Sequence, residues 1–157
     1  MLTILMILAI ILTGLMAGFF FAYWCSVMVG LRSVRDETFV ETMQHINVVL
    51  PNAMFAPPFF GALILPGAAA WIAFRDGQSE VGWWLVASFV LYLATFAITA
   101  ARNVPMNNAL ANAGTPQDAE DAARIRAEFE GPWVRWNTIR TATNCASFVA
   151  AVIALAV

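Results

Sequence analysis

Two apolar stretches of this sequence carry polar side chains at helical spacing, and these are the residues whose types and positions could do chemistry. In residues 81–103 and again in residues 134–156, with Trp133 just before, a polar or indole side chain recurs every three or four positions, which makes one stripe on one helix face. The stripes consist of Ser88, Tyr92, Thr95, Thr99, Arg102 and Asn103, and of Trp133, Trp136, Asn137, Arg140, Asn144 and Ser147. Polar groups are costly inside a membrane, so their arrangement is the best indication of function.

The richest parts of both stripes lie at the same depth, because the first stretch ends on the side where the second begins. Residues of the first loop arrive at that end as well, and further asparagines flank Pro105. We therefore expect one cluster of amides, indoles, guanidiniums and a single imidazole at one mouth of the bundle. The candidate site residues are Gln44, His45, Asn47, Tyr92, Asn103, Asn107, Trp133, Trp136, Asn137 and Arg140.

Arg140 is the most informative member of the cluster, because no acidic residue lies on its own stripe to neutralise it. Its guanidinium could bind a carboxylate, a phenolate or an enolate. The alternative interpretation is that the polar groups only hold helices together, each contributing about 0.6 kcal/mol on average.

Several kinds of site are excluded by composition. One histidine in the chain excludes a bis-histidine haem, and the acidic residues all lie in loops, which excludes a carboxylate-rich di-iron site within the bundle. No glycine-rich phosphate loop or dinucleotide fingerprint occurs. We therefore expect no metal and no cofactor, so any redox chemistry would use a substrate that is itself redox-active.

The elements that position these residues are membrane-spanning helices. Of the 157 residues, 61% are hydrophobic and 11% are charged, whereas soluble domains carry about 25% charged residues. Four apolar stretches, at about residues 2–30, 52–74, 81–103 and 134–156, each approach the length of about 20 residues that a helix needs to cross a bilayer. The sequence predicts an all-α fold: a single membrane domain, residues 1–157, with four transmembrane helices and almost nothing outside the bilayer.

Two short amphipathic helices are expected in the loops. Apolar residues at helical spacing from Phe39 to Leu50 predict one in the first loop, lying along the interface or folded back over the bundle mouth. In the third loop, the residues around Thr115 predict a helix cap, and that helix should stop before Gly131-Pro132. The preceding span should kink or stop at Pro105.

Arginine placement predicts the orientation. Seven of the eight arginines lie around the first and third loops, which places those loops in the cytoplasm, with both termini outside, most simply in a bacterial inner membrane. The net charge of −2 argues against nucleic acid as a partner. Gly14 and Gly18 allow another helix to approach closely, either within the chain or in a homo-oligomer or larger membrane complex.

Several motifs resemble one known family. In chain order they are GFFFAYWCSVM at 18–28 before Gly30-Leu31, Phe39-Val40, Met43-Gln44, Ile46-Asn47, Asn103-Val104-Pro105-Met106-Asn107 with Leu110, and Trp133 with Trp136-Asn137 and Arg140. This series resembles the anthrone oxygenase-like family of small four-helix membrane proteins from bacteria and fungi, and it covers nearly the entire chain.

The resemblance implies a cofactor-independent monooxygenase that oxidises an anthrone-like phenolic compound to a quinone with O₂. A flat aromatic substrate would enter from the lipid bilayer and contact Gln44, Asn47, Asn103, Trp133, Trp136 and Tyr92. Arg140 with Asn137 and Asn107 would stabilise its enolate. His45, the only imidazole, is the default general base, although it lies outside the family's core motif.

Another class of function stays open at this point. A non-catalytic membrane subunit, packed against a larger complex or binding a lipid or quinone, would use the same composition. A cavity at the mouth of the bundle would favour the enzyme, whereas a filled core with exposed apolar faces would favour the subunit.

Overall fold

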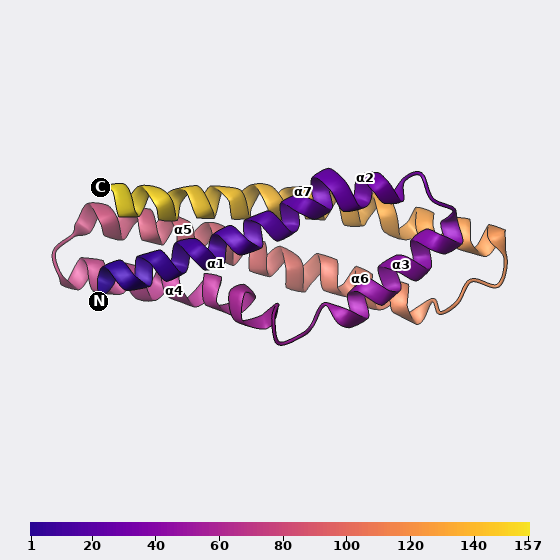
Figure 1. Ribbon diagram of the computed structural model, residues 1–157, viewed down its shortest axis with the longest axis horizontal. Coiled ribbons are helices and arrows are strands. Elements are labelled where there is room, and N and C mark those ends of the chain that lie inside the picture. Colours follow the sequence, from indigo (N-terminus) through magenta and orange to yellow (C-terminus); the bar gives the residue numbers. More distant parts are fainter.

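The chain folds into a long bundle of helices, described over residues 1–157 by a computed structural model (Figure 1). It contains no strand. The helices are α1 (Leu2–Ala22), α2 (Met28–Leu31), α3 (Asp36–Val49), α4 (Ala56–Arg75), α5 (Ser79–Ile98), α6 (Val104–Asn112) and α7 (Ala119–Ala156). Two π-helical turns, η1 (Tyr23–Val27) and η2 (Thr99–Asn103), join α1 to α2 and α5 to α6.

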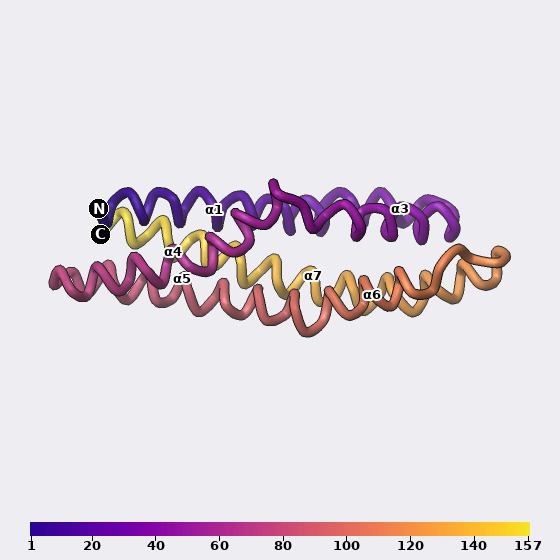
Figure 2. The backbone as a smooth tube through the Cα atoms, turned by 90° about the horizontal axis from the view of Figure 1, so that it is seen from below, coloured from indigo at the N-terminus to yellow at the C-terminus, as the bar shows by residue number.

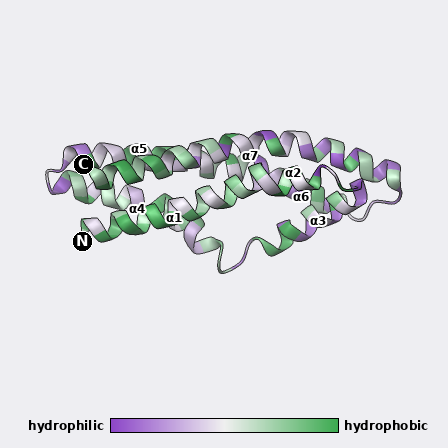
Figure 3. Cartoon of the chain, turned by 45° about the horizontal axis from the view of Figure 1, so that its top comes forward, coloured by the Kyte–Doolittle hydropathy of each residue, from purple (hydrophilic) through white to green (hydrophobic).

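Four helical segments are long and apolar enough to cross a membrane: Leu2–Leu31, Ala56–Arg75, Ser79–Asn112 and Ala119–Ala156. Large apolar side chains such as Ile11 and Trp71 are exposed on their outer faces, as lipid contact requires. Figure 3 shows hydrophobic residues along α1, α4 and α5, with hydrophilic residues gathered near the start of α7. The predicted all-α fold with four spans is confirmed, and the protein is an integral membrane protein.

The bundle is longer than a bilayer is thick. The 38 residues of α7 extend about 57 Å, against about 30 Å of hydrocarbon. The prediction that almost nothing lies outside the bilayer is therefore wrong. Both termini and the α4–α5 turn lie at one end, whereas α2, α3, α6 and the start of α7 form the other half (Figures 1 and 2).

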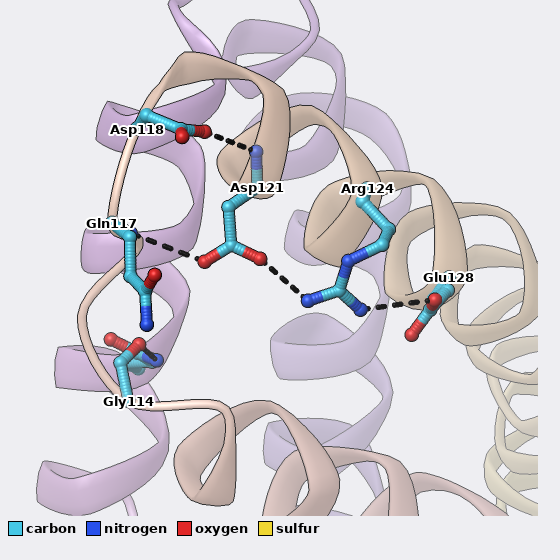
Figure 4. A network of polar contacts seen from close by, with 7 residues as sticks. Gly114, Gln117, Asp118, Asp121, Arg124 and Glu128 are labelled. Atoms are coloured by element: carbon cyan, nitrogen blue, oxygen red, sulfur yellow. Dashed lines mark hydrogen bonds and ion pairs between the residues drawn. The ribbon is translucent and has the colours of Figure 1, made fainter.

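The start of α7 differs from the predicted cap at Thr115. Asp118 is the N-cap, and its Oδ1 accepts a hydrogen bond from the backbone N–H of Asp121 at 2.9 Å (Figure 4). The Asp121 carboxylate accepts a second bond, from the backbone N–H of Gln117, at 3.1 Å. The acidic pair thus satisfies one backbone donor of the first helical turn and one immediately before the helix.

The predicted stop before Pro132 is wrong, and at Pro105, where a kink or a stop was expected, the helix does not stop. α7 continues through Pro132, and α5 continues through η2 and Pro105 into α6 as one segment. At Pro105 the wide π turn absorbs the irregularity, since the N–H of Val104 bonds the Thr99 carbonyl five residues back. At Pro132 the flanking rings of Phe129 and Trp133 stack at 6.0 Å inside a buried cluster, and this packing outweighs the local break.

The first-loop helix α3 folds back against α6 and α7, one of the two predicted placements. Arg126 of α7 anchors its start through an ion pair with Asp36 at 2.9 Å and hydrogen bonds to three carbonyls of the α2–α3 connection. Gln44 donates hydrogen bonds to the carbonyl oxygens of Leu110 at 2.9 Å and Gly114 at 2.8 Å. α3 therefore completes the bundle in the half opposite the termini.

Gly14 allows a close contact inside the chain. A Cβ there would lie 3.0 Å from the Phe148 ring of α7, whereas Gly18 has no such neighbour. The first glycine of the pair therefore serves α1–α7 packing.

Candidate functional site

A cavity of about 450 Å³ lies at the level where α4 begins. It is lined by the end of α1 with η1, the end of α3 with the following loop, the start of α4, η2 with α6, and the middle of α7. Its volume falls within the range of about 300–1,000 Å³ that is typical of small-molecule sites. The bundle therefore has room for a compact ligand where its two halves meet.

Aromatic rings form much of the cavity wall. Phe59 stacks on Phe55 with ring centroids 5.2 Å apart, and Phe19 lies 5.4 Å from Phe55. Tyr23 continues this group, since its ring lies 5.1 Å from that of Phe19 and 5.7 Å from that of Trp133. Flat rings of this kind bind a flat aromatic ligand through apolar contact and stacking.

Arg140 supplies the only charge in the wall. Its side chain is 6% exposed, and it takes part in no ion pair. Its Nε donates to Asn137 Oδ1 at 3.1 Å and its Nη1 to Thr99 Oγ1 at 3.4 Å. The guanidinium carbon also lies 4.4 Å from the centroid of the Phe20 ring.

A buried cation without a carboxylate partner has lost its hydration and has no negative charge nearby to compensate for that loss. The neutral amide and hydroxyl fix the orientation of the guanidinium but do not cancel its charge. Arg140 is therefore a candidate site for an anion, or for an oxygen that becomes negative during a reaction.

Four asparagines line the cavity: Asn47, Asn103, Asn107 and the exposed Asn108. Asn103 is fully buried, and neither its Nδ2 nor its Oδ1 has a hydrogen-bond partner; Asn47 Nδ2 is also unpartnered. Asn107 Oδ1 accepts from Trp133 Nε1 at 2.8 Å, which leaves its NH₂ group free. Because an unpartnered buried polar group costs about 1–3 kcal/mol, these amides are candidate ligand-binding groups.

Both π-helical turns border this cavity. Tyr23 is the first residue of η1, and Thr99 and Asn103 are the first and last residues of η2. π turns inside α-helices occur frequently at functional sites, because the extra residue in the turn redirects side chains. Here the two turns, on different spans, direct three polar side chains to one place.

Five of the residues predicted from the sequence line the cavity together: Asn47, Asn103, Asn107, Trp133 and Arg140. A sixth, Asn137, lies directly behind Arg140 and binds it, while its Nδ2 donates to the Phe20 carbonyl at 3.5 Å.

Four other predicted residues do not reach the cavity. His45 lies on the outer face of α3, with its side chain 79% exposed and Nε2 4.0 Å from Glu41. Trp136 packs under Arg102, whose guanidinium lies 4.9 Å from the indole centroid. Tyr92 is fully buried and donates to the Phe59 carbonyl at 2.9 Å, and Gln44 ties α3 to α6.

The candidate residues drawn from the sequence omit three polar residues of the wall: Tyr23, Thr99 and Asn108, the last being one of the asparagines beside Pro105. Thr99 belongs to the predicted stripe and could have been chosen as a neighbour of Arg140. Tyr23 lies in an unbroken apolar run, where no periodic signal separates a cavity residue from a lipid-facing one. No group of three or more His, Cys, Asp or Glu side chains could hold a metal ion.

No curated protein and no solved structure matches the chain. The family model for anthrone oxygenase, however, matches residues 52–150, more than half of the chain. The matched range includes four of the predicted residues in the cavity wall, Asn103, Asn107, Trp133 and Arg140. On the strength of this match, and in agreement with the motifs read from the sequence, the chain belongs to the anthrone oxygenase family.

Proposed function

We propose that this protein is a membrane-embedded, cofactor-independent monooxygenase that oxidises an anthrone-like phenolic compound to a quinone with O₂. The observation that carries the proposal is Arg140, a buried cation without a counter-ion in the wall of an aromatic cavity beside the unpartnered amide of Asn103. Such a wall is suited to a flat aromatic molecule that becomes an anion during its reaction.

The chemistry requires no group beyond substrate, O₂ and the protein. Loss of the benzylic proton of the anthrone gives an enolate, whose oxygen lies against the guanidinium of Arg140 and the amide of Asn103. The electron-rich carbon transfers two electrons to O₂ and forms a C–O bond, giving a peroxide anion. Protonation gives the hydroperoxide, which loses water as its O–O and C–H bonds break, leaving the quinone.

The polar residues around Arg140 and Asn107 have distinct roles in this scheme. Arg140 stabilises the enolate, which lowers the free energy needed to remove the proton. Asn137 and Thr99 position the guanidinium, and Trp133 orients the amide of Asn107. His45 has no part in the proposal, because its exposed position on α3 is outside the cavity.

The proposed setting follows the arginine distribution: a bacterial inner membrane, with the α2–α3 and α6–α7 connections in the cytoplasm and both termini outside. The cavity would then lie near the cytoplasmic boundary of the bilayer, where a phenol dissolved in lipid is accessible. The existence of a cavity also supports the enzyme over a non-catalytic subunit, for which a filled core was expected.

The test is O₂ uptake and anthraquinone formation by the detergent-purified protein supplied with anthrone. The decisive variant is Arg140→Met, which keeps the volume of the side chain and removes the charge. Arg102→Met is the matched control, since Arg102 is an exposed cation on the same region of the bundle but outside the cavity wall. Removing one stabiliser of an oxyanion typically lowers kcat by about 100- to 1,000-fold.

We expect such a loss for Arg140→Met and none for Arg102→Met, after subtraction of spontaneous anthrone oxidation. Equal rates in all three proteins, each shown to be folded by its circular dichroism spectrum, would refute anthrone oxidation. The non-catalytic binding subunit would then be the better interpretation.

A further inference from the structure

Two ionisable side chains line the cavity, Arg140 and Tyr23. The proposed reaction needs a cation to stabilise the enolate, and it also needs a proton donor for the peroxide anion. A guanidinium is a poor proton donor because it stays charged, and a neutral amide is a poorer one. Among the residues of the wall, a phenolic hydroxyl has the chemistry for this second task.

The structure holds the Tyr23 ring in a defined position. Its centroid lies 5.1 Å from that of Phe19 and 5.7 Å from that of Trp133, so aromatic neighbours contact it on two sides. It begins the π turn η1, which faces the same cavity as Thr99 and Asn103 of η2.

The Tyr23 hydroxyl is free for a ligand. It makes no hydrogen bond within the protein, unlike the hydroxyl of the chain's other tyrosine, Tyr92, which donates to the Phe59 carbonyl. Trp133, which packs against Tyr23, also contacts the cation, since the Arg140 guanidinium carbon lies 5.2 Å from the Trp133 ring centroid. Arg140 and Tyr23 thus share one neighbour and line the same cavity, in which a ligand oxygen held by Arg140 would lie.

We propose that Tyr23 is a catalytic residue of this site, the proton donor to the peroxide anion, in an inference that rests on the function proposed above. The benzylic proton of the substrate leaves to water, and the enolate adds O₂. The Tyr23 O–H bond breaks as its proton joins the peroxide anion, which gives the hydroperoxide and a tyrosinate. The tyrosinate regains a proton from water, and the hydroperoxide loses water to form the quinone.

Kinetics of Tyr23→Phe give the first test. This change removes one oxygen atom and keeps the ring between Phe19 and Trp133. General acid catalysis typically contributes about 100- to 10,000-fold to a rate, so we expect kcat to fall about 100-fold with KM changed less than about threefold. The matched control is Trp24→Phe, the next residue of the same π turn, which is 47% exposed and outside the cavity wall.

Binding of alizarin, a hydroxyanthraquinone dye that turns from yellow to red when its phenol ionises, gives a second test that needs no turnover. Tyr23 can donate to the bound phenolate, so the colour change should occur at higher pH in Tyr23→Phe than in the unchanged protein. Trp24→Phe should titrate like the unchanged protein.

The outcomes separate this inference from the proposed function. If the unchanged protein oxidises anthrone and Tyr23→Phe matches it in kcat and in the alizarin titration, Tyr23 is not the donor and the oxygenase proposal stands. If the unchanged protein fails to oxidise anthrone, the oxygenase proposal is refuted and the catalytic role of Tyr23 with it; a titration that still depends on Tyr23 would then assign it to ligand binding alone.

Discussion

Replacement of buried asparagines by leucine should change stability with opposite signs at different positions. Asn103 and Asn144 are fully buried, and neither polar atom of either amide has a partner in the protein. Asn137 is equally buried, but it accepts a hydrogen bond from Arg140 and donates one to the Phe20 carbonyl. We expect Asn103→Leu and Asn144→Leu to stabilise the fold and Asn137→Leu to destabilise it.

The magnitude follows from the hydrogen-bond inventory. A buried polar group without a partner costs about 1–3 kcal/mol, and replacing it with an apolar group of similar shape removes that cost. At Asn137 the change instead leaves the Arg140 Nε without its acceptor, and a lost hydrogen bond to a charged group costs about 1.5–3 kcal/mol. For a domain of this size about 1 kcal/mol shifts the unfolding midpoint by roughly 2–4 °C, so a difference of several degrees in each direction is expected.

The assay is thermal unfolding in one detergent, followed by circular dichroism, together with alizarin binding. Asn103→Leu should raise the midpoint and weaken binding, because Asn103 lines the cavity. Asn144→Leu should raise the midpoint and leave binding unchanged, because Asn144 is outside the wall. A lower midpoint for both Asn103→Leu and Asn144→Leu would refute the reasoning, since it would mean that their amides are satisfied in the folded protein.

Two further predictions concern packing outside the cavity. Arg126→Met should loosen α3 and increase protease cleavage in the α2–α3 connection, because Arg126 is mostly buried and binds Asp36 of α3 and the carbonyl of Val34. The control Arg124→Met should have little effect, since its ion pairs are solvent-exposed; equal cleavage of both variants would contradict the prediction. Gly14→Ala should lower the unfolding midpoint, because its new methyl group meets the Phe148 ring, whereas Gly18→Ala should not; a drop of the same size for both would mean that this contact does not limit α1–α7 packing.

The sequence by itself determined the four membrane-spanning helices and the helix face on which the cation Arg140 lies. Apolar runs long enough for a bilayer specify four spans whatever their partners, because backbone groups in lipid must bond within the helix. Polar residues at helical spacing placed Asn103, Asn137 and Arg140 on definite faces, and the lack of an acid near Arg140 in its stripe already indicated an anion site. These features depend on composition and local periodicity, and both can be read from a single sequence without knowledge of the fold.

Only the tertiary structure decided which neighbouring residues those polar helix faces contact. Periodicity gives the direction of a side chain around its own helix but not the neighbour across from it, so Tyr92 and Trp136 were expected at the site although they pack elsewhere. The position of α3 excluded His45 and retained Asn47, two residues apart on one helix. That choice depends on contacts with α6 and α7, which are distant in the chain.

The ends of the helices were also decided by tertiary contacts. A proline predicts a local break, but packing around Phe129 and Trp133 kept α7 continuous, and a π turn carried α5 past Pro105. The same π turns direct Tyr23 and Asn103 into one cavity, and no residue pattern in the sequence predicts these turns. The cavity exists because helices that are distant in the sequence leave unfilled space between them, which is a property of the assembled bundle and of no single helix.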